Sequence, residues 1–354
     1  MPDIKSYVRA TGFIFKLVQN KETVPAGISI KDSTYPGISG EEVPLKIFTN
    51  SSGTKDVVIL YPGASPYGEY HPKMLALGAV LAESRFTVFI PRIPPLKELD
   101  ISEINIQWFN HFYKWMLEKQ QVPAEKIAMV GLSYGGGLML KSLLETNGKL
   151  PSPKAILTYG TYSDGRTIVQ FLLNGEISLH GSTYTIPPHE WGLVVIFHNF
   201  LKNLSLDWDS TKIQTALTYQ ISENFAERDK VVDSMPKDQQ NLFHSILKGE
   251  ATPEIKALVD DIVENEEDAF INLSPKFWGD KIKEKVFILH GANDSMVPFT
   301  ESIKLADYIP ENELLISYIY EHKEISNNRG YFFTLREISR LINFYAKFFH
   351  HYAH

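Results

Sequence analysis

The sequence predicts an α/β protein built on a mostly parallel β-sheet with helices on both faces. From about residue 42, short apolar runs alternate with longer segments whose apolar residues recur every three or four positions. The first pattern is typical of buried strands and the second of amphipathic helices. Strands that alternate with helices favour right-handed β-α-β units, which build parallel sheets. The alternation stops between residues 166 and 283, which indicates a large insertion.

Each expected strand is a short run of apolar or alternating residues, and several are closed by a turn residue. Val57–Tyr61 is followed by Pro62-Gly63, and Phe86–Ile90 is followed by Pro91. Proline ends a strand because it lacks the N–H that a sheet needs, and glycine adopts turn conformations without strain. The expected strands are 42–48, 57–61, 86–90, 126–130, 155–159, 286–289 and 314–319.

The expected helices lie between these strands and after the last one. In the segment 104–116, Ile104, Trp108, Phe112 and Trp115 recur at spacings of four and three, which places them on one helix face. The expected helices are 74–82, 104–116, a helix after the strand 126–130, 301–308 and 334–349.

Residues 1–165 and 284–354 are therefore expected to form the sheet domain, and residues 166–283 a mainly helical insertion. Within the insertion, the segment 191–201 is apolar nearly all round, which is typical of a buried helix. It is far too short to span a membrane. Two interpretations stay open: it is the insertion's own core, or it is the inner wall of a lid that receives a hydrophobic group.

Composition and charge exclude several classes of function. The net charge of −7 argues against nucleic-acid binding, because phosphates would be repelled. The chain has no cysteine, so it has no disulfide, no thiolate nucleophile and no cysteine-ligated zinc site. We see neither a signal-peptide core nor a membrane span and expect a soluble, cytoplasmic protein. The acidic run 264–268 and the three histidines 350, 351 and 354 are expected to be solvated.

The segment Gly131-Leu132-Ser133-Tyr134-Gly135 joins the strand 126–130 to a helix-like run. A strand that turns sharply into a helix leaves no room for side chains beside the turning residue. Glycines two positions before and two after Ser133 supply that room, and the serine is held on a strained turn with its hydroxyl exposed. The N-terminus of the next helix offers N–H groups to a developing oxyanion. This pattern occurs once in the chain.

A serine hydroxyl becomes a good nucleophile when a base takes its proton and an acid orients that base. In a parallel sheet, these groups are expected in loops that follow strands. Asp294 follows the strand 286–289, and His322 is the only histidine in such a loop after Ser133. Asp164, which follows the strand 155–159, is the alternative acid.

The chain order Ser133, Asp294, His322 is the order of the α/β-hydrolases, and the chain resembles that superfamily over about residues 42–165 and 284–349. The resemblance rests on the glycine-flanked serine, on the histidine after the final strand, and on the segment His290-Gly291-Ala292-Asn293-Asp294 with Val297-Pro298. It implies that Ser133 is the nucleophile, His322 the base and Asp294 the residue that orients the base.

The same resemblance implies an oxyanion hole made of two backbone N–H groups. One belongs to Tyr134, the residue after the nucleophile, and the other to Ala64, in the loop after the strand 57–61. Pro62 departs from the histidine that many members carry in that loop. The resemblance also implies that the insertion acts as a cap over the site.

We therefore expect a serine hydrolase that cleaves a carboxylic ester or thioester with an apolar group, with no cofactor and no metal. Phe197 and Phe200, in the apolar segment of the insertion, are the expected substrate-binding residues. Two alternatives stay open: an acyltransferase on the same triad, and a non-catalytic binding protein on the same scaffold. A peptidase is less favoured because no extra β-rich gating domain is visible. The sequence does not fix the substrate or the oligomeric state.

Overall fold

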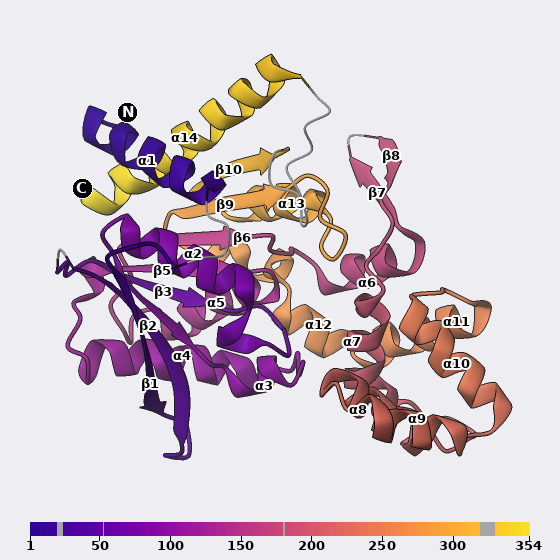
Figure 1. The fold of residues 1–354 in the computed structure, drawn as a ribbon. Helices are drawn as coiled ribbons and strands as arrows, with labels where there is room; N and C mark the ends of the chain where they lie inside the picture. Colours follow the sequence, from indigo (N-terminus) through magenta and orange to yellow (C-terminus); the bar gives the residue numbers. More distant parts are fainter. Residues whose placement is uncertain (20–23, 52, 180, 319–329) are drawn as a thin grey trace.

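An eight-stranded β-sheet forms the centre of the protein (Figure 1). The computed structural model describes residues 1–19, 24–51, 53–179, 181–318 and 330–354. The strand order is β1-β2-β4-β3-β5-β6-β9-β10. From β4 to β10 every neighbouring pair is parallel, whereas β2 pairs antiparallel with both β1 and β4. The strands are β1 (Ile28–Pro36), β2 (Glu42–Asn50), β3 (Val57–Tyr61), β4 (Thr87–Pro91), β5 (Ile127–Leu132), β6 (Ala155–Tyr159), β9 (Val286–Gly291) and β10 (Asn312–Ser317).

The two faces of the sheet are covered by separate layers of helices. One layer contains α1 (Ile4–Gln19), α2 (Pro72–Glu83) and α14 (Tyr331–Ala353), and the other contains α4 (Ile104–Glu118), α5 (Tyr134–Thr146) and α13 (Phe299–Tyr308). Side chains of β3 show why both layers are needed: Val58 and Leu60 pack on the first layer, and Val57, Ile59 and Tyr61 on the second. Successive residues of a strand point to opposite faces, so a continuous apolar run requires cover on both sides.

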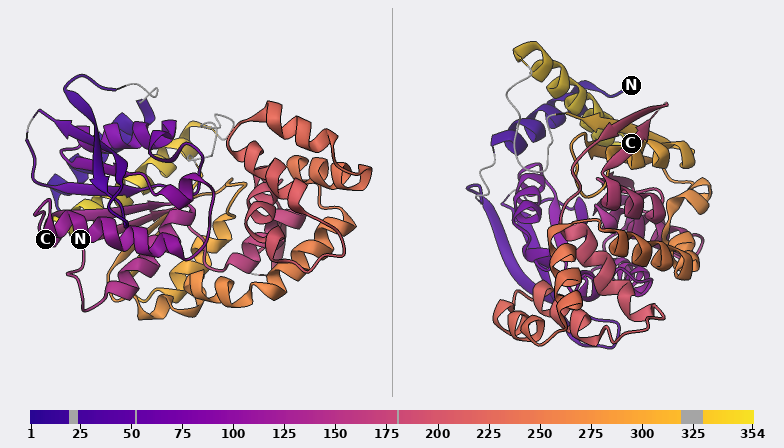
Figure 2. Two further views of the ribbon diagram at one scale, coloured as in Figure 1. Left: turned by 90° about the horizontal axis from the view of Figure 1, so that it is seen from below. Right: turned by 90° about the vertical axis from the view of Figure 1, so that its right-hand side faces the viewer.

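The chain between β6 and β9 forms a separate lobe beside the sheet domain (Figures 1 and 2). It has its own buried apolar core, which includes Ile213, Leu217, Phe243, Val259 and Ile262. Its elements are α6 (Gly165–Asn174), β7 (Glu176–Leu179), β8 (Ser182–Thr185), α7 (Trp191–Phe200), α8 (Thr211–Ile221), α9 (Phe225–Asp233), α10 (Lys237–Lys248), α11 (Pro253–Asn265) and α12 (Glu267–Leu273).

The architecture confirms the predicted fold class, a mostly parallel sheet flanked by helices. The expected strands and helices of the sheet domain are present within a few residues of their predicted bounds. The structure adds α1, β1, the short helix α3 (Pro94–Lys97) and the β7–β8 hairpin, none of which we expected. No helix in the described part of the chain is long and apolar enough to cross a bilayer. The role of the insertion as a cap stays a prediction.

Candidate active site

Ser133 lies between β5 and α5 in a conformation that a serine rarely adopts. Its φ is 51° and its ψ is −128°, so it carries the backbone strain expected for an exposed nucleophile on a tight turn. The turn is held by backbone contacts: the Ser133 N–H donates to the Tyr159 carbonyl at 2.7 Å, and the Gly136 N–H donates to the Ser133 carbonyl at 3.0 Å. The Ser133 hydroxyl does not cap α5, although serine often caps the helix that follows it.

The glycines around Ser133 are required by close packing. A Cβ on Gly131 would lie 2.7 Å from the Cα of Gly136, and a Cβ on Gly135 would lie 2.0 Å from the Pro62 carbonyl oxygen. Neither neighbour is the end of a flexible side chain, so backbone would have to move. The glycines therefore allow the turn, the start of α5 and the loop after β3 to touch.

The loop after β3 lies against the serine. An ideal Cβ on Gly63 would be 3.1 Å from the Ser133 Cβ and 3.7 Å from its Oγ. Ala64 comes next in this loop, and Tyr134 is the first residue of α5. Within the described residues, neither the Ala64 N–H nor the Tyr134 N–H donates a hydrogen bond to another protein group. These are the two groups that the sequence predicts as oxyanion donors, and that role stays a prediction.

The Tyr134 side chain is fixed away from the turn. Its hydroxyl donates to the Ile101 carbonyl at 2.6 Å, and its ring stacks on Tyr162 with the ring centroids 5.3 Å apart. Burial raises the pKa of the Tyr134 hydroxyl well above its usual value, so the group stays a proton donor in its hydrogen bond. These contacts of the Tyr134 side chain also hold the backbone N–H of this residue in position.

Asp294 is buried close to the serine turn, in the loop after β9. Its Oδ1 accepts hydrogen bonds from the N–H groups of Met296 and Val297, at 2.9 and 3.0 Å. Its Oδ2 lies 3.3 Å from the position that a Cβ on Gly160 would occupy. Gly160 directly follows Tyr159, whose carbonyl accepts the Ser133 N–H, so Asp294 and Ser133 contact two adjacent residues of the chain.

His290 is in the same region, but both of its ring nitrogens already have partners. Nδ1 is 2.6 Å from the Ser302 hydroxyl and Nε2 is 2.9 Å from the Val297 carbonyl, and the ring is fully buried. These contacts join β9 to α13 and give His290 a structural role. His322, the expected base, lies outside the described residues.

Asp164, the alternative acid, is occupied by other partners. Its carboxylate caps α6, accepts two hydrogen bonds from the Arg166 guanidinium at 3.2 Å, and pairs with Lys276 at 3.0 Å. Burial opposes ionisation of this carboxyl, but the hydrogen bonds from Arg166 and Lys276 outweigh it and lower the pKa. An acid held in this way is suited to fastening the insertion to the strand end rather than to orienting a mobile base.

The two expected substrate-binding residues lie in α7. Phe197 is fully buried in the apolar core of the insertion, whereas Phe200 is half-buried, with its ring centroid 5.7 Å from that of Phe270. Phe197 is therefore part of the insertion's own core, which was one of the two interpretations of this helix. Their contact with substrate stays a prediction.

The insertion meets the sheet domain at loops that follow its strands. The His189 N–H donates to the Ser295 carbonyl at 2.8 Å, next to Asp294. The Asn199 amide donates to the Leu99 carbonyl at 2.8 Å and accepts from the Ile101 N–H at 3.0 Å. Ala64 packs against the insertion's core as well as against the sheet domain's core. The insertion is therefore seated beside the loops that carry the candidate site.

Sequence reasoning missed the contribution of the segment after β6. The Thr161 hydroxyl donates to the Ser133 carbonyl at 3.1 Å, Gly160 makes room for Asp294, and Tyr162 stacks on Tyr134. In the sequence these residues are an ordinary Gly-Thr-Tyr after a strand. The only available signal is the glycine, whose φ of +65° suits a turn.

No protein-family model and no curated protein matches this chain. Among solved structures it is similar to an acylaminoacyl peptidase (13% identity, TM-score 0.49, covering 93% of this chain and 42% of that one). It is also similar to a hormone-sensitive lipase from a metagenome library (14% identity, TM-score 0.48, 98% and 94% covered) and to an esterase/lipase from an uncultured bacterium (14% identity, TM-score 0.48, 94% and 87% covered).

The chain thus spans less than half of the peptidase and nearly all of the lipase. The expected α/β-hydrolase fold rests on features of this chain itself, namely the order and parallel pairing of the strands and the serine turn after β5.

Proposed function

We propose that this protein is a serine hydrolase that cleaves a carboxylic ester or thioester through an acyl-enzyme. The observation that carries the proposal is the strained conformation of Ser133, with φ 51°, on a turn held by hydrogen bonds with Tyr159, Gly136 and Thr161. Strain of this kind persists only where surrounding contacts over-determine it, and it clusters at active sites. A serine needed only to cap α5 would not require it.

In the proposed mechanism, His322 removes the Ser133 hydroxyl proton as the Oγ attacks the carbonyl carbon of the substrate. The carbonyl oxygen becomes an oxyanion and accepts hydrogen bonds from the N–H groups of Ala64 and Tyr134. The protonated His322 then gives its proton to the leaving alcohol or thiol, and an acyl-Ser133 ester remains. Water, deprotonated by His322, attacks this ester and releases the carboxylic acid.

Asp294 is proposed to orient His322 and stabilise its protonated form. Its buried carboxylate is held by two backbone N–H groups at Oδ1, and its Oδ2 lies 3.6 Å from His290 Nε2. The strand register supports the pairing, because Ser317, the last residue of β10, lies opposite Gly291, the last residue of β9. The chain thus enters the segment that contains His322 at the same edge of the sheet as Asp294.

We further propose that the insertion covers the site and accepts the apolar part of the substrate. The contacts of Asn199 and His189 with loops after β4 and β9 support this. Phe200 is the better residue for a test, because replacing the fully buried Phe197 by alanine would cost about 3–5 kcal/mol of stability by itself. Phe200→Glu should then reduce turnover of long-chain esters more than turnover of acetate esters.

Labelling with a fluorophosphonate probe tests the nucleophile. We expect the parent protein to be labelled on Ser133 and the Ser133→Ala variant to lose labelling and ester turnover together. Ser65→Ala is the matched control: Ser65 lies in the neighbouring loop after β3, where its Oγ accepts from the Tyr67 N–H, and its loss should leave labelling intact. Undiminished labelling of Ser133→Ala would show that the nucleophile has been misassigned.

The same labelling and turnover measurements distinguish a hydrolase from an acyltransferase and from a non-catalytic binding protein. An acyltransferase would be labelled too, but in the presence of an alcohol it would form more transfer product than free acid. A non-catalytic binding protein would show neither labelling nor turnover with any member of a p-nitrophenyl ester series.

A further inference from the structure

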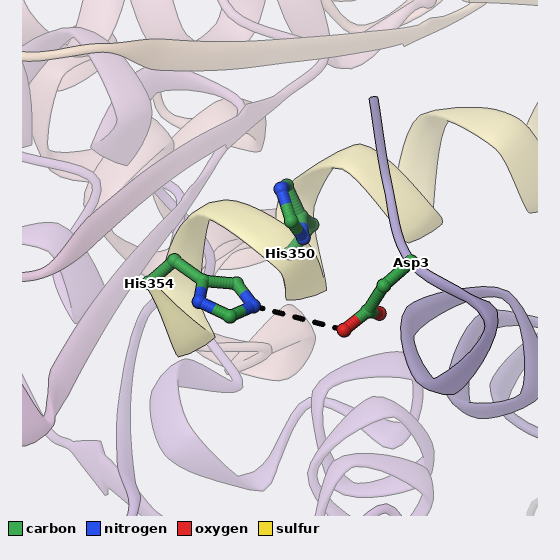
Figure 3. Close-up of side chains that lie close together, drawn as sticks. All are labelled: Asp3, His350 and His354. Carbon is green, nitrogen blue, oxygen red and sulfur yellow. Dashed lines mark ion pairs between the residues drawn. The ribbon is translucent and has the colours of Figure 1, made fainter.

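The two ends of the described chain meet on the face of the protein formed by α1 and α14 (Figure 1). Phe13 of α1 packs against Tyr345 and Phe349 of α14, with ring centroids 4.6 and 5.8 Å apart. At the outer end of this contact, Asp3 lies beside His350 and His354 (Figure 3). His350 lies in the last turn of α14, and His354, four residues on, is the residue directly after the helix; its N–H still donates to the His350 carbonyl, so the two histidines lie on the same side.

The three side chains are close enough to bind one ion together. One possible ligand atom from each residue lies within 4.8 Å of the other two. The shortest approach is between Asp3 Oδ2 and His354 Nε2, at 3.7 Å. Tetrahedral zinc with bonds of about 2.0–2.1 Å holds its nitrogen and oxygen ligands about 3.3 Å apart. Side-chain rotation alone could therefore bring this pair to bonding distance.

The groups also have the chemistry of a metal site. Two imidazoles and one carboxylate suit divalent ions of the zinc type. The Ser6 N–H is 2.8 Å from Asp3 Oδ1, which orients the carboxylate, while Oδ2 faces His354. Outer hydrogen bonds of this kind are a regular feature of metal ligands.

His350 provides a separate observation. Its Nδ1 is buried and has no hydrogen-bond partner in the described part of the chain. A buried imidazole nitrogen without a partner costs free energy unless another group binds there. The nearby ion pair does not explain this nitrogen, because that pair joins Asp3 to His354.

We propose that Asp3, His350 and His354 form a binding site for a divalent transition-metal ion of the zinc type, which links the start of α1 to the last turn of α14. Water completes the coordination. The site is independent of the proposed hydrolase activity, because its residues lie at the start of α1 and the end of α14 and none of them belongs to the candidate active site. Its effect is structural: the bound ion holds the N-terminal helix on the C-terminal one.

Zinc titration of the chain without a polyhistidine tag tests the proposal. We expect one Zn²⁺ per chain by calorimetry, and a melting temperature that rises with Zn²⁺ concentration because the ion binds only the folded form. Co²⁺ should give the intense visible absorption of a four-coordinate site. Absence of binding up to about 1 mM Zn²⁺, the weakest affinity that would matter, would overturn the proposal.

Three variants locate the site. His350→Ala, His354→Ala and Asp3→Asn should each weaken Zn²⁺ binding by at least about tenfold and reduce the thermal shift. Asparagine caps helices as well as aspartate does, so Asp3→Asn removes the ligand charge without removing the cap of α1. His351→Ala is the control, because the His351 ring packs on Phe287 and lies outside the cluster. Binding that survives in all three variants, or that His351→Ala alone abolishes, would contradict the assignment.

Discussion

Close contacts around Ser133 leave no room for a side chain at the neighbouring glycines. Gly135 is the clearest case, because a methyl group there would lie 2.0 Å from the Pro62 carbonyl oxygen. Accommodating it requires the loop after β3 to move away from the start of α5. That loop carries Ala64, so the change would separate the two proposed oxyanion donors as well as strain the fold.

We therefore expect Gly135→Ala to lower the free energy of unfolding by about 1–3 kcal/mol, as overpacking does. Gly12 provides a matched control, because it lies within α1 with no atom within 4 Å of an added Cβ. Gly12→Ala should raise stability by about 0.5–1 kcal/mol, since glycine is a poor helix former. Urea unfolding measures both values. Similar effects of the two substitutions would mean that the close packing at Gly135 is unimportant.

Two aspartates follow strands in the sequence, and the chain alone could not rank them on structural grounds. Asp164 is bound by Arg166, two residues further on, and by Lys276, which is more than a hundred residues away. Asp294 instead accepts hydrogen bonds at Oδ1 from the backbone N–H groups of Met296 and Val297, which follow it closely in the chain. Long-range partners such as Lys276 become visible only once the insertion is folded.

The pKa of Asp164 gives a test that depends on pH. Because this pKa is lowered in the folded chain, the stabilisation is fully present above the unfolded value of about 3.9 and is lost as pH falls through the lower, folded value. Asp164→Asn should cost about 1–3 kcal/mol at pH 7, and the difference from the parent should shrink below about pH 4. Urea unfolding at several pH values measures this difference.

Activity separates the two aspartates further. Asp164→Asn should keep most ester turnover, whereas Asp294→Asn should lose about four orders of magnitude, as expected for the acid of a serine triad. The opposite result would identify Asp164 as the orienting acid.

At the scale of elements, the strands with the clearest sequence pattern were those buried on both faces. β3, β5, β6 and β9 are continuous apolar runs, because each is covered by two helix layers. β1 is an edge strand with one fully buried residue, and β8 is exposed throughout, so neither carries a clear apolar pattern. These missed strands are defined more by their hydrogen bonds than by buried side chains.

α7 and the start of α5 are linked through one segment of backbone. Asn199 of α7 binds the Leu99 carbonyl and the Ile101 N–H, and the Tyr134 hydroxyl binds the Ile101 carbonyl. The insertion and the proposed oxyanion residue thus fasten the same three residues, Leu99–Ile101. Loosening that segment from one side should weaken its attachment on the other.

A double-mutant cycle tests this link. We expect Asn199→Ala and Tyr134→Phe to be coupled by about 0.5 kcal/mol or more in their effects on unfolding. Gln239→Ala is the control partner for Tyr134→Phe, because Gln239 binds the Asp209 carbonyl inside the insertion. That pair should be additive within about 0.5 kcal/mol. Equal coupling in both cycles would mean that the Leu99–Ile101 segment does not specifically link Asn199 to Tyr134.

At the scale of the whole molecule, the protein has two kinds of core. The two apolar clusters on either side of the sheet share the strands as a common wall. The cluster of the insertion is built from the insertion's own residues together with Leu99, and Ala64, Met296 and Phe299 of the sheet domain pack against its edge. A core with so few shared side chains is a candidate for a separate cooperative unit.

We expect heat to unfold the insertion before the sheet domain, in two calorimetric transitions. Leu217 of α8 and Leu305 of α13 are a matched pair, because both are fully buried helical leucines, one in each unit. Each leucine-to-alanine change should cost about 2–5 kcal/mol in the unit that contains it. Leu217→Ala should therefore lower the first midpoint by about 4 °C or more and leave the second nearly unchanged, while Leu305→Ala should lower the second. A single transition that both variants shift equally would show that contacts such as Asp164–Lys276 and Asn199–Leu99 join the two units into one.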